Sequence, residues 1–371
     1  MQNGVICMKK ILLVDDSALM RRVLCDIINS DGRFSVTAEA CNGLEALEYL
    51  KKEDFDAVVL DVNMPKLDGL GLLRELKSFG INARILMAST VTEEGGRITM
   101  EALELGASDF IHKPDWSFKC KEEEFRTSFL DTLEAVASAK VSIDDKNERT
   151  DDKVVKDNIA KVEELIRKKK ENFTGERIVA LAVSTGGPKS LQSVIPLLPK
   201  DLAAPVVLVQ HMPEGFTASL ASRLNSISDI KVKEGEEGET IHKGCVYIAK
   251  AGKHLKLIKN GEDTIIKYTD EAYREGVKPC ANYMYESLAS CDYDEVVCVV
   301  MTGMGADGTE GIKNLKKSGQ KSYVITQEGD SCVVYGMPKA CFNAGLSDST
   351  VTLTQIAQEI ILRVGVKQNG C

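Results

Sequence analysis

Residues 177–188 read Arg177-Ile-Val-Ala-Leu-Ala-Val-Ser184-Thr-Gly-Gly-Pro188, and this stretch decides how the rest of the chain is interpreted. Its apolar run, residues 178–183, is continuous and rich in branched side chains, which is typical of a strand buried on both faces. The two glycines allow a sharp turn, and the fixed backbone angle of Pro188 suits the first position of a helix. We therefore expect a strand, a tight turn and a helix, with the hydroxyl of Ser184 on the turn.

Two later stretches have the same character. Residues 205–211 form an apolar run that ends on His211, and residues 295–301 form another, followed by a glycine-rich turn that contains Asp307. The carboxyl ends of parallel strands lie along one rim, where open α/β sheets bind their ligands. We therefore expect Ser184, His211 and Asp307 to meet although they are far apart in sequence.

These three residue types together predict nucleophilic catalysis. A serine hydroxyl becomes a nucleophile when an imidazole takes its proton, and a carboxylate on the other ring nitrogen orients that imidazole. Backbone N–H groups near Thr185, or in the turn of residues 302–305, would bind an oxyanion. Taken singly, each residue also has a plain structural interpretation, as a turn serine, a structural histidine or an aspartate in an Asp-Gly turn.

Composition excludes several classes of protein. The 371 residues are 43% hydrophobic and 28% charged, which is ordinary for soluble globular domains and enough for two of them. A net charge of -9 argues against a nucleic-acid-binding output, and no apolar run approaches the ~20 residues of a membrane span. The N-terminus lacks the pattern of a secretory signal, and the 11 cysteines have no zinc or redox spacing. We therefore expect reduced thiols and a cytoplasmic location.

The first part of the chain alternates strand and helix patterns. Five apolar segments with strand character are separated by helical patterns, at residues 10–14, 36–40, 57–60, 84–88 and 109–112. This rhythm predicts a five-stranded, doubly wound parallel sheet.

Polar side chains again collect at the strand ends. Asp15, Asp16 and Asp61 would repel one another unless a divalent cation joined them, and Mg²⁺ prefers such carboxylate oxygens. Ser89 offers a hydroxyl and Lys113 a cation at the same rim, so the set suits a carboxylate that accepts a phosphoryl group. Any one aspartate alone is better explained as a cap of a turn or helix.

Residues 9–126 resemble a response-regulator receiver domain. The matching motifs are Asp15-Asp16, Asp61-Val-Asn-Met-Pro65 with Asp68-Gly69, Ser89 and Lys113-Pro114. The resemblance implies that Asp61 is the phospho-acceptor and that a histidine kinase donates the phosphoryl group. It further implies Mg²⁺ ligands and switch residues: Asp15, Asp16, Asp61 and the Asn63 carbonyl for the ion, and Ser89, Lys113 and Phe110 for the switch.

Residues 127–176 hold an end helix and then a charged segment that reads as an exposed linker. Apolar residues recur at helical spacing over 155–166, which predicts an amphipathic helix that either docks on one domain or is solvated. The second domain, residues 177–367, adds short strands at 244–249, 255–258 and 322–326. An Asn-Gly signal at Asn260 predicts an antiparallel hairpin beside a doubly wound sheet.

Residues 177–367 resemble the catalytic domain of the chemotaxis protein-glutamate methylesterases, the CheB family. The matching motifs are Ser184-Thr-Gly-Gly187, Gln210-His-Met-Pro213, Val246-Tyr-Ile-Ala249, Met301-Thr-Gly-Met-Gly-Ala-Asp-Gly308 and Tyr335-Gly-Met-Pro338. The resemblance implies a nucleophile at Ser184, a base at His211, an orienting acid at Asp307 and a backbone oxyanion donor at Met304. It implies hydrolysis of glutamate γ-methyl esters on methyl-accepting chemotaxis receptors, with deamidation of receptor glutamines in many relatives and a receiver that covers the rim until phosphorylated.

Two departures from the family pattern bear on substrate preference, and three alternatives stay open. Lys250 stands where the family often has proline, and residues 277–282, Val-Lys-Pro-Cys-Ala-Asn, replace a more polar segment. The chain could be mainly a glutamine deamidase, since ester and amide hydrolysis use the same residues. A non-enzymatic phospho-switch is disfavoured because a binding module needs no complete triad. A DNA-binding output is disfavoured by the charge.

Overall fold

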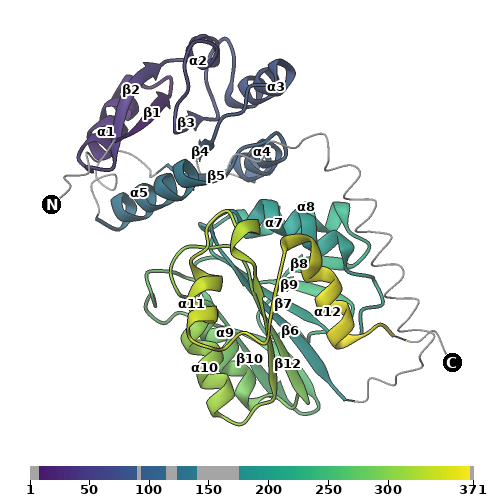
Figure 1. Cartoon of the computed structure of the whole chain (residues 1–371). Helices are drawn as coiled ribbons and strands as arrows, with labels where there is room; N and C mark the ends of the chain where they lie inside the picture. The colour runs from purple at the N-terminus through teal and green to yellow at the C-terminus, as the bar shows by residue number, and fades with distance from the viewer. Residues whose placement is uncertain (1–7, 90–92, 114–122, 140–174, 368–371) are drawn as a thin grey trace. The chain divides into compact units, whose positions relative to one another are not determined.

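The computed structural model describes residues 8–89, 93–113, 123–139 and 175–367. It divides into two units, Met1–Ile143 and Asp144–Cys371, which are described separately (Figure 1). The helix predicted over residues 155–166 lies outside the described residues. In the described part of the chain, no helix has both the length and the apolar character needed to cross a membrane.

The first unit is the predicted five-stranded parallel sheet, in the order β2-β1-β3-β4-β5. Its strands are β1 (Lys9–Val14), β2 (Phe34–Ala40), β3 (Ala57–Asp61), β4 (Ile85–Ser89) and β5 (Asp109–His112). Its helices are α1 (Ala18–Asn29), α2 (Gly43–Leu50), α3 (Gly69–Phe79), α4 (Glu93–Glu104) and α5 (Glu123–Ser138).

One core of this unit lies between the sheet and the pair α1 and α5. Leu24 and Ile28 of α1 and Phe129 and Leu133 of α5 are buried there against β1, β3 and β4. Helix α5 therefore packs in the same core as β1, and the end helix expected at the start of residues 127–176 belongs to this unit.

The second unit has a seven-stranded sheet in which every neighbouring pair is parallel, in the order β14-β13-β12-β6-β7-β9-β8. The strands are β6 (Arg177–Val183), β7 (Val206–Gln210), β8 (Lys231–Glu234), β9 (Cys245–Ile248), β12 (Glu295–Val300), β13 (Ser322–Gln327) and β14 (Ser349–Val351). The predicted hairpin is a separate antiparallel pair, β10 (His254–Asn260) and β11 (Asp263–Thr269).

Helices cover both faces of this sheet. They are α7 (Gly187–Val194), α8 (Phe216–Ile227), α9 (Ala281–Ser287), α10 (Thr309–Lys317), α11 (Met337–Asn343) and α12 (Ile356–Val364). Short 3₁₀ turns occur at Ile195–Leu197, Leu288–Ser290, Gly329–Ser331 and Leu353–Gln355. Figure 1 shows α9, α10 and α11 together and α7, α8 and α12 together. Residues 178–183 of β6 are all fully buried, as a strand covered on both faces requires.

The strand order sets where the chain changes direction. On one side of β6 lie β7, β9 and β8, in that order. On the other side of β6 lie β12, β13 and β14. The switch point therefore lies between β6 and β12, where connections leave toward opposite sides and open sheets hold their ligands. The segments after β6, β7 and β12 are the three that carry the predicted triad.

Candidate active site

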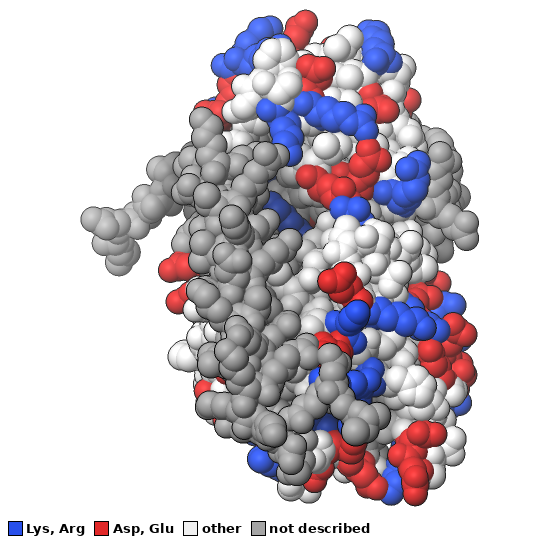
Figure 2. Space-filling model, turned by 90° about the vertical axis from the view of Figure 1, so that its right-hand side faces the viewer, with Lys and Arg blue, Asp and Glu red and all other residues white. Residues whose placement is uncertain are grey.

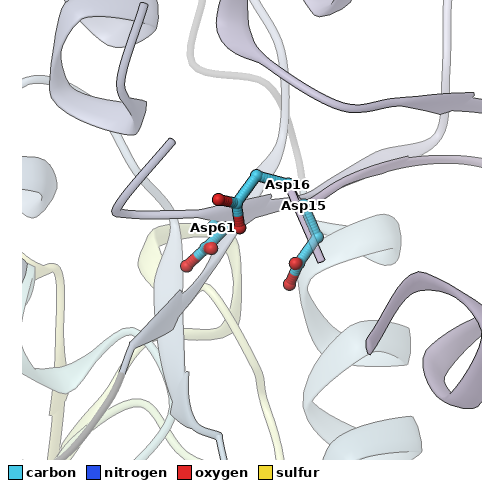
Figure 3. A group of neighbouring side chains, drawn as sticks. All are labelled: Asp15, Asp16 and Asp61. Atoms are coloured by element: carbon cyan, nitrogen blue, oxygen red, sulfur yellow. The ribbon is translucent and has the colours of Figure 1, made fainter. Parts of the chain in front are cut away.

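The first unit gathers three carboxylates at the ends of β1 and β3. Oxygens of Asp15, Asp16 and Asp61 all lie within 4.8 Å of one another (Figure 3). The ammonium of Lys113 lies 2.5 Å from Asp15 Oδ2 and 2.7 Å from Asp61 Oδ1. Asp15 and Asp61 are buried and Asp16 is exposed. The group is thus half open to solvent, with a cation on its inner side.

The electrostatics of this group suit a divalent cation. Burial raises the pKa of Asp61 above its ordinary value, although the charge and hydrogen bond of Lys113 oppose that effect. One lysine does not neutralise three carboxylates, so a further positive charge would stabilise them. Carboxylate oxygens with room for water on one side are what Mg²⁺ takes, so the residues present fit that ion.

The three predicted switch residues lie on the neighbouring strands. Ser89 ends β4 and is 1% exposed, Phe110 is buried on β5, and Lys113 follows β5. The Lys113 N–H donates to Ser89 O at 2.7 Å, which ties the two strand ends together. Asn63 is exposed on the loop after β3. The structure therefore brings Ser89 and Lys113 to the strand ends that carry the three aspartates, whereas Phe110 lies within β5.

In the second unit, Ser184, His211 and Asp307 follow three adjacent strands, β6, β7 and β12. The Ser184 N–H donates to Thr302 O at 2.9 Å, and the His211 N–H donates to Val183 O at 3.1 Å. These bonds join the three strand ends at the switch point, as the apolar runs predicted.

His211 and Asp307 form a hydrogen-bonded pair. His211 Nε2 lies 2.8 Å from Asp307 Oδ2, and Asp307 is 3% exposed. Because the carboxylate can only accept, Nε2 must carry a proton, and in the neutral tautomer that fits this bond Nδ1 is an acceptor. Among the described residues no hydrogen bond joins the Ser184 hydroxyl to His211, so the structure places the serine at the shared rim without completing its bond to the histidine.

Asp307 also holds the start of α9. Oδ2 accepts from the Ala281 N–H at 2.6 Å, and Oδ1 accepts from the Asn282 N–H at 3.0 Å and from the Cys280 thiol at 3.0 Å. Burial works to raise the pKa of Asp307, but the hydrogen bond and charge of His211 and these donors hold it below its ordinary value. The carboxylate is therefore kept ionised where it meets the imidazole.

The two helices beside the site cap each other. While Asp307 caps α9, Asn282 Oδ1 accepts from the N–H groups of Gly308 and Gly311, at 3.1 and 2.6 Å, at the start of α10. Sequence reasoning did not predict these roles for Cys280 and Asn282. The signal available was the departure of residues 277–282 from the family pattern, which the sequence alone connects with substrate preference only.

His254 lies beneath the site. Its Nδ1 accepts from the Cys280 N–H at 3.2 Å, its Nε2 donates to Ala272 O at 3.1 Å, and its ring centroid is 4.6 Å from that of Tyr283. Burial lowers its pKa below the ordinary histidine value, against the effect of the Ala272 bond. This fully buried neutral ring supports the residue before α9 and leaves His211 as the imidazole at the rim.

The backbone donors predicted for an oxyanion, at Thr185 and Met304, lie on the two turns that meet at Ser184. Within the described chain, the N–H groups of Thr185 and Met304 have no acceptor, and Met304 is 42% exposed. Gly303 allows the loops to approach, since a Cβ there would lie 2.7 Å from Ser184 Cβ. Both donors thus lie on segments that contact the serine.

Comparisons with known proteins match both units. The family model described as CheB methylesterase matches residues 179–360, and that of the response regulator receiver domain matches residues 11–118. A protein-glutamate methylesterase/protein-glutamine glutaminase of Bacillus subtilis is 42% identical over 358 residues, which cover 95% of this chain and 98% of the relative. A protein of the same name from Halalkalibacterium halodurans is 39% identical, with coverages of 95% and 97%.

Among solved structures, the crystal structure of the Thermotoga maritima CheB methylesterase catalytic domain is 39% identical, with a TM-score of 0.49. It covers 51% of this chain and 99% of that one. The full-length sequence matches settle the family. The chain belongs to the CheB methylesterase family, as a hydrolase that joins a response-regulator receiver domain to a methylesterase domain.

Proposed function

We propose that this protein hydrolyses glutamyl γ-methyl esters on methyl-accepting chemotaxis receptors and that phosphorylation of its receiver controls the rate. One observation carries the proposal: Ser184 lies at a topological switch point beside the hydrogen-bonded pair His211 and Asp307. The names of the relatives, protein-glutamate methylesterase/protein-glutamine glutaminase, support methyl-ester hydrolysis at protein glutamates and add deamidation of protein glutamines.

The reaction follows from the proton positions. Ser184 Oγ attacks the ester carbonyl while its proton passes to His211 Nδ1, and Asp307 stabilises the imidazolium through Nε2–H. The N–H groups of Thr185 and Met304 stabilise the oxyanion. His211 then gives its proton to the leaving methoxide, and methanol departs. Water, activated by the same imidazole, cleaves the acyl-serine to glutamate and restores the hydroxyl.

Deamidation uses the same steps with ammonia as the leaving group. A protonated His211 serves equally to protonate a departing amine, so no further residue is required. We therefore propose both activities for one site.

We further propose that Asp61 accepts a phosphoryl group from a chemotaxis histidine kinase. Asp15, Asp16, Asp61 and the Asn63 carbonyl would hold Mg²⁺, which neutralises charge on the transferring phosphoryl group when bound. Ser89, Lys113 and Phe110 would read the modified state through the bonds that tie β4 to β5. The domains would span residues 9–126 and 177–367, joined by residues 127–176, in a cytoplasmic protein.

The surface supports a protein substrate over a nucleic acid. Figure 2 shows basic and acidic side chains interspersed over the described surface on the face in view. The net charge is -9, and a phosphate backbone calls for a continuous basic face.

The deciding experiment is methanol release from methylated chemoreceptor membranes, with and without a phosphoryl donor. Ser184→Ala should lose about 10⁴–10⁶-fold in kcat, as expected when a triad nucleophile is removed. The exposed serine variant Ser226→Ala is the matched control and should retain full activity. Ammonia without methanol would replace the esterase by a deamidase, and neither product, even when phosphorylated, would overturn the proposal.

The receiver proposal has its own test. Acetyl phosphate should label the chain in a Mg²⁺-dependent way, and Asp61→Asn should abolish the label because it removes the accepting oxygen. Asp54→Asn, an exposed aspartate of the same unit, should be labelled like wild type. Label that persists in Asp61→Asn would reject this acceptor.

A further inference from the structure

Gln210, the last residue of β7, joins the main chains of two triad residues. Its side chain is 1% exposed, and its Nε2 donates to Ser184 O at 3.0 Å and to His211 O at 2.9 Å. A carboxamide has two N–H bonds, so both are used on these carbonyls. No other described side chain bonds the main chains of both residues.

The orientation of this carboxamide is set by its donors. A reversed amide would point Oε1 at two carbonyl oxygens, which have no proton to give. In the observed orientation, Oε1 is buried without a hydrogen-bond partner among the described residues. It lies against Gly187, where a Cβ would come within 2.1 Å. An unpaired buried acceptor is unfavourable, so the two bonds from Nε2 must hold the side chain in place.

These bonds fix the peptide unit between Ser184 and Thr185. Ser184 O accepts a second bond from the Gly187 N–H at 2.7 Å, so two donors hold that oxygen. A trans peptide is planar, and its N–H points away from its C=O. The direction of the Thr185 N–H is therefore set by the groups that hold Ser184 O. That N–H has no acceptor in the described chain.

The histidine is held to the same segment from both sides. The His211 N–H donates to Val183 O at 3.1 Å, and His211 O accepts from Gln210. Gln210 is itself the register partner of Val183 in the pairing of β6 with β7. The main chains that carry nucleophile and base are thus coupled directly through one side chain.

We propose that Gln210 is a positioning residue for hydrolysis: its carboxamide locks the Ser184–Thr185 peptide to His211 and aims the Thr185 N–H at the oxyanion. The inference rests on the proposed function, because it assigns Thr185 N–H to the transition state. Gln210 acts through the main chain and does not touch the substrate.

The test measures kcat and KM for methanol release from methylated receptor membranes with the full chain. Gln210→Met keeps the volume and removes both donors, so kcat should fall about 10–100-fold with KM within two-fold, the cost of a misdirected donor. Thr326→Val is the matched control, since Thr326 is a fully buried hydrogen-bonding residue of β13 away from these contacts, and its kcat should be unchanged. Thermal unfolding of each variant reports folding.

Gln210→Glu provides a second measurement, the pH dependence of kcat, which would not change if Gln210 had only a structural role. At neutral pH the introduced carboxylate faces two carbonyl oxygens and should lower kcat more than Gln210→Met does. Protonation of that carboxyl restores one donor, so the ratio of its kcat to that of wild type should rise as the pH falls. This variant decides the matter if Gln210→Met does not fold.

The outcomes separate the two proposals. A wild-type chain that releases neither methanol nor ammonia overturns the proposed function. An active wild type with kcat of folded Gln210→Met within two-fold overturns the positioning role, as does an equal loss in Thr326→Val or a pH-independent ratio for Gln210→Glu. A loss confined to kcat in the Gln210 variants supports it.

Discussion

Replacing Asp307 with asparagine tests whether hydrolysis depends on which nitrogen of His211 carries the proton. In the wild type, Oδ2 faces two donors, His211 Nε2 at 2.8 Å and the Ala281 N–H at 2.6 Å. Oδ1 faces three, from Cys280, Asn282 and Gly308. An asparagine has one oxygen, and the three donors hold it on the Oδ1 side. Its NH₂ group then faces the imidazole.

The imidazole must respond by accepting at Nε2 and carrying its proton on Nδ1. It can then no longer take the proton of Ser184. We expect kcat to fall about 10³–10⁴-fold, which is the loss typical when the acid of a triad is replaced by its amide. This loss corresponds to an activation barrier that is roughly 4–5.5 kcal/mol higher. The Ala281 N–H also loses its acceptor at the start of α9, at a cost of about 1–3 kcal/mol in unfolding free energy.

The assay is methanol release together with thermal unfolding. A domain of this size should lose roughly 2–12 °C in Tm for that cost. Asp270→Asn is the control, because Asp270 is exposed and pairs with Lys278 at 2.5 Å away from the triad, so it should match wild type in kcat. A kcat for folded Asp307→Asn within ten-fold of wild type would refute the tautomer argument.

Three further predictions concern the groups around Asp307. Cys280→Ser keeps a donor to Asp307 Oδ1 and should retain kcat within about two-fold. Cys280→Ala should lower kcat about 3–10-fold, because a hydrogen bond to a charged group is lost. Equal methanol-release rates for the two variants would contradict this. ¹⁵N spectra of the 4 histidines should show His254 protonated on Nε2 alone and neutral below its ordinary pKa of 6.5, because burial lowers the pKa. The unfolded chain takes that proton first, so the free energy of unfolding should fall as the pH drops below 6.5; a His254 that titrates at or above this value would exclude the buried neutral ring. The depressed pKa of Asp307 contributes stability that is fully present above the ordinary carboxyl value of 3.8 and lost as the pH falls through the folded value. The stability of Asp307→Asn, followed by circular dichroism as the pH is lowered, should therefore lack this contribution. An acid-unfolding curve identical to that of wild type would contradict the prediction.

The sequence predicted the central strands better than the edges. The apolar runs of β6, β7 and β12 were recognisable as strands from the sequence. The predicted parallel sheet and the hairpin at Asn260-Gly261 were confirmed. Strands β8 and β14 were missed. Both are sheet edges, of four and three residues, and β8 reads Lys-Val-Lys-Glu with a single buried side chain, so neither has a pattern to detect.

The rim of the second unit was predictable, but its supporting contacts were not. Topology alone brings Ser184, His211 and Asp307 to adjacent strand ends. The bond from Cys280 to Asp307 depends on the path of the loop after β11, which no periodicity encodes. The burial of His254 against Tyr283 likewise depends on how the hairpin packs on α9, which the sequence does not encode locally. The catalytic roles themselves stay predictions.

The place of β6 in the sheet also has a consequence during synthesis. Its partner β7 follows within 30 residues, but Glu295, which pairs with Arg177, is made 118 residues later. At roughly 5–20 residues per second, β12 leaves the ribosome about 6–24 s after β6. Until then, six apolar residues form an open strand edge, a template for aggregation. We therefore expect the nascent chain to be most prone to aggregation during that interval, before β12 pairs with β6.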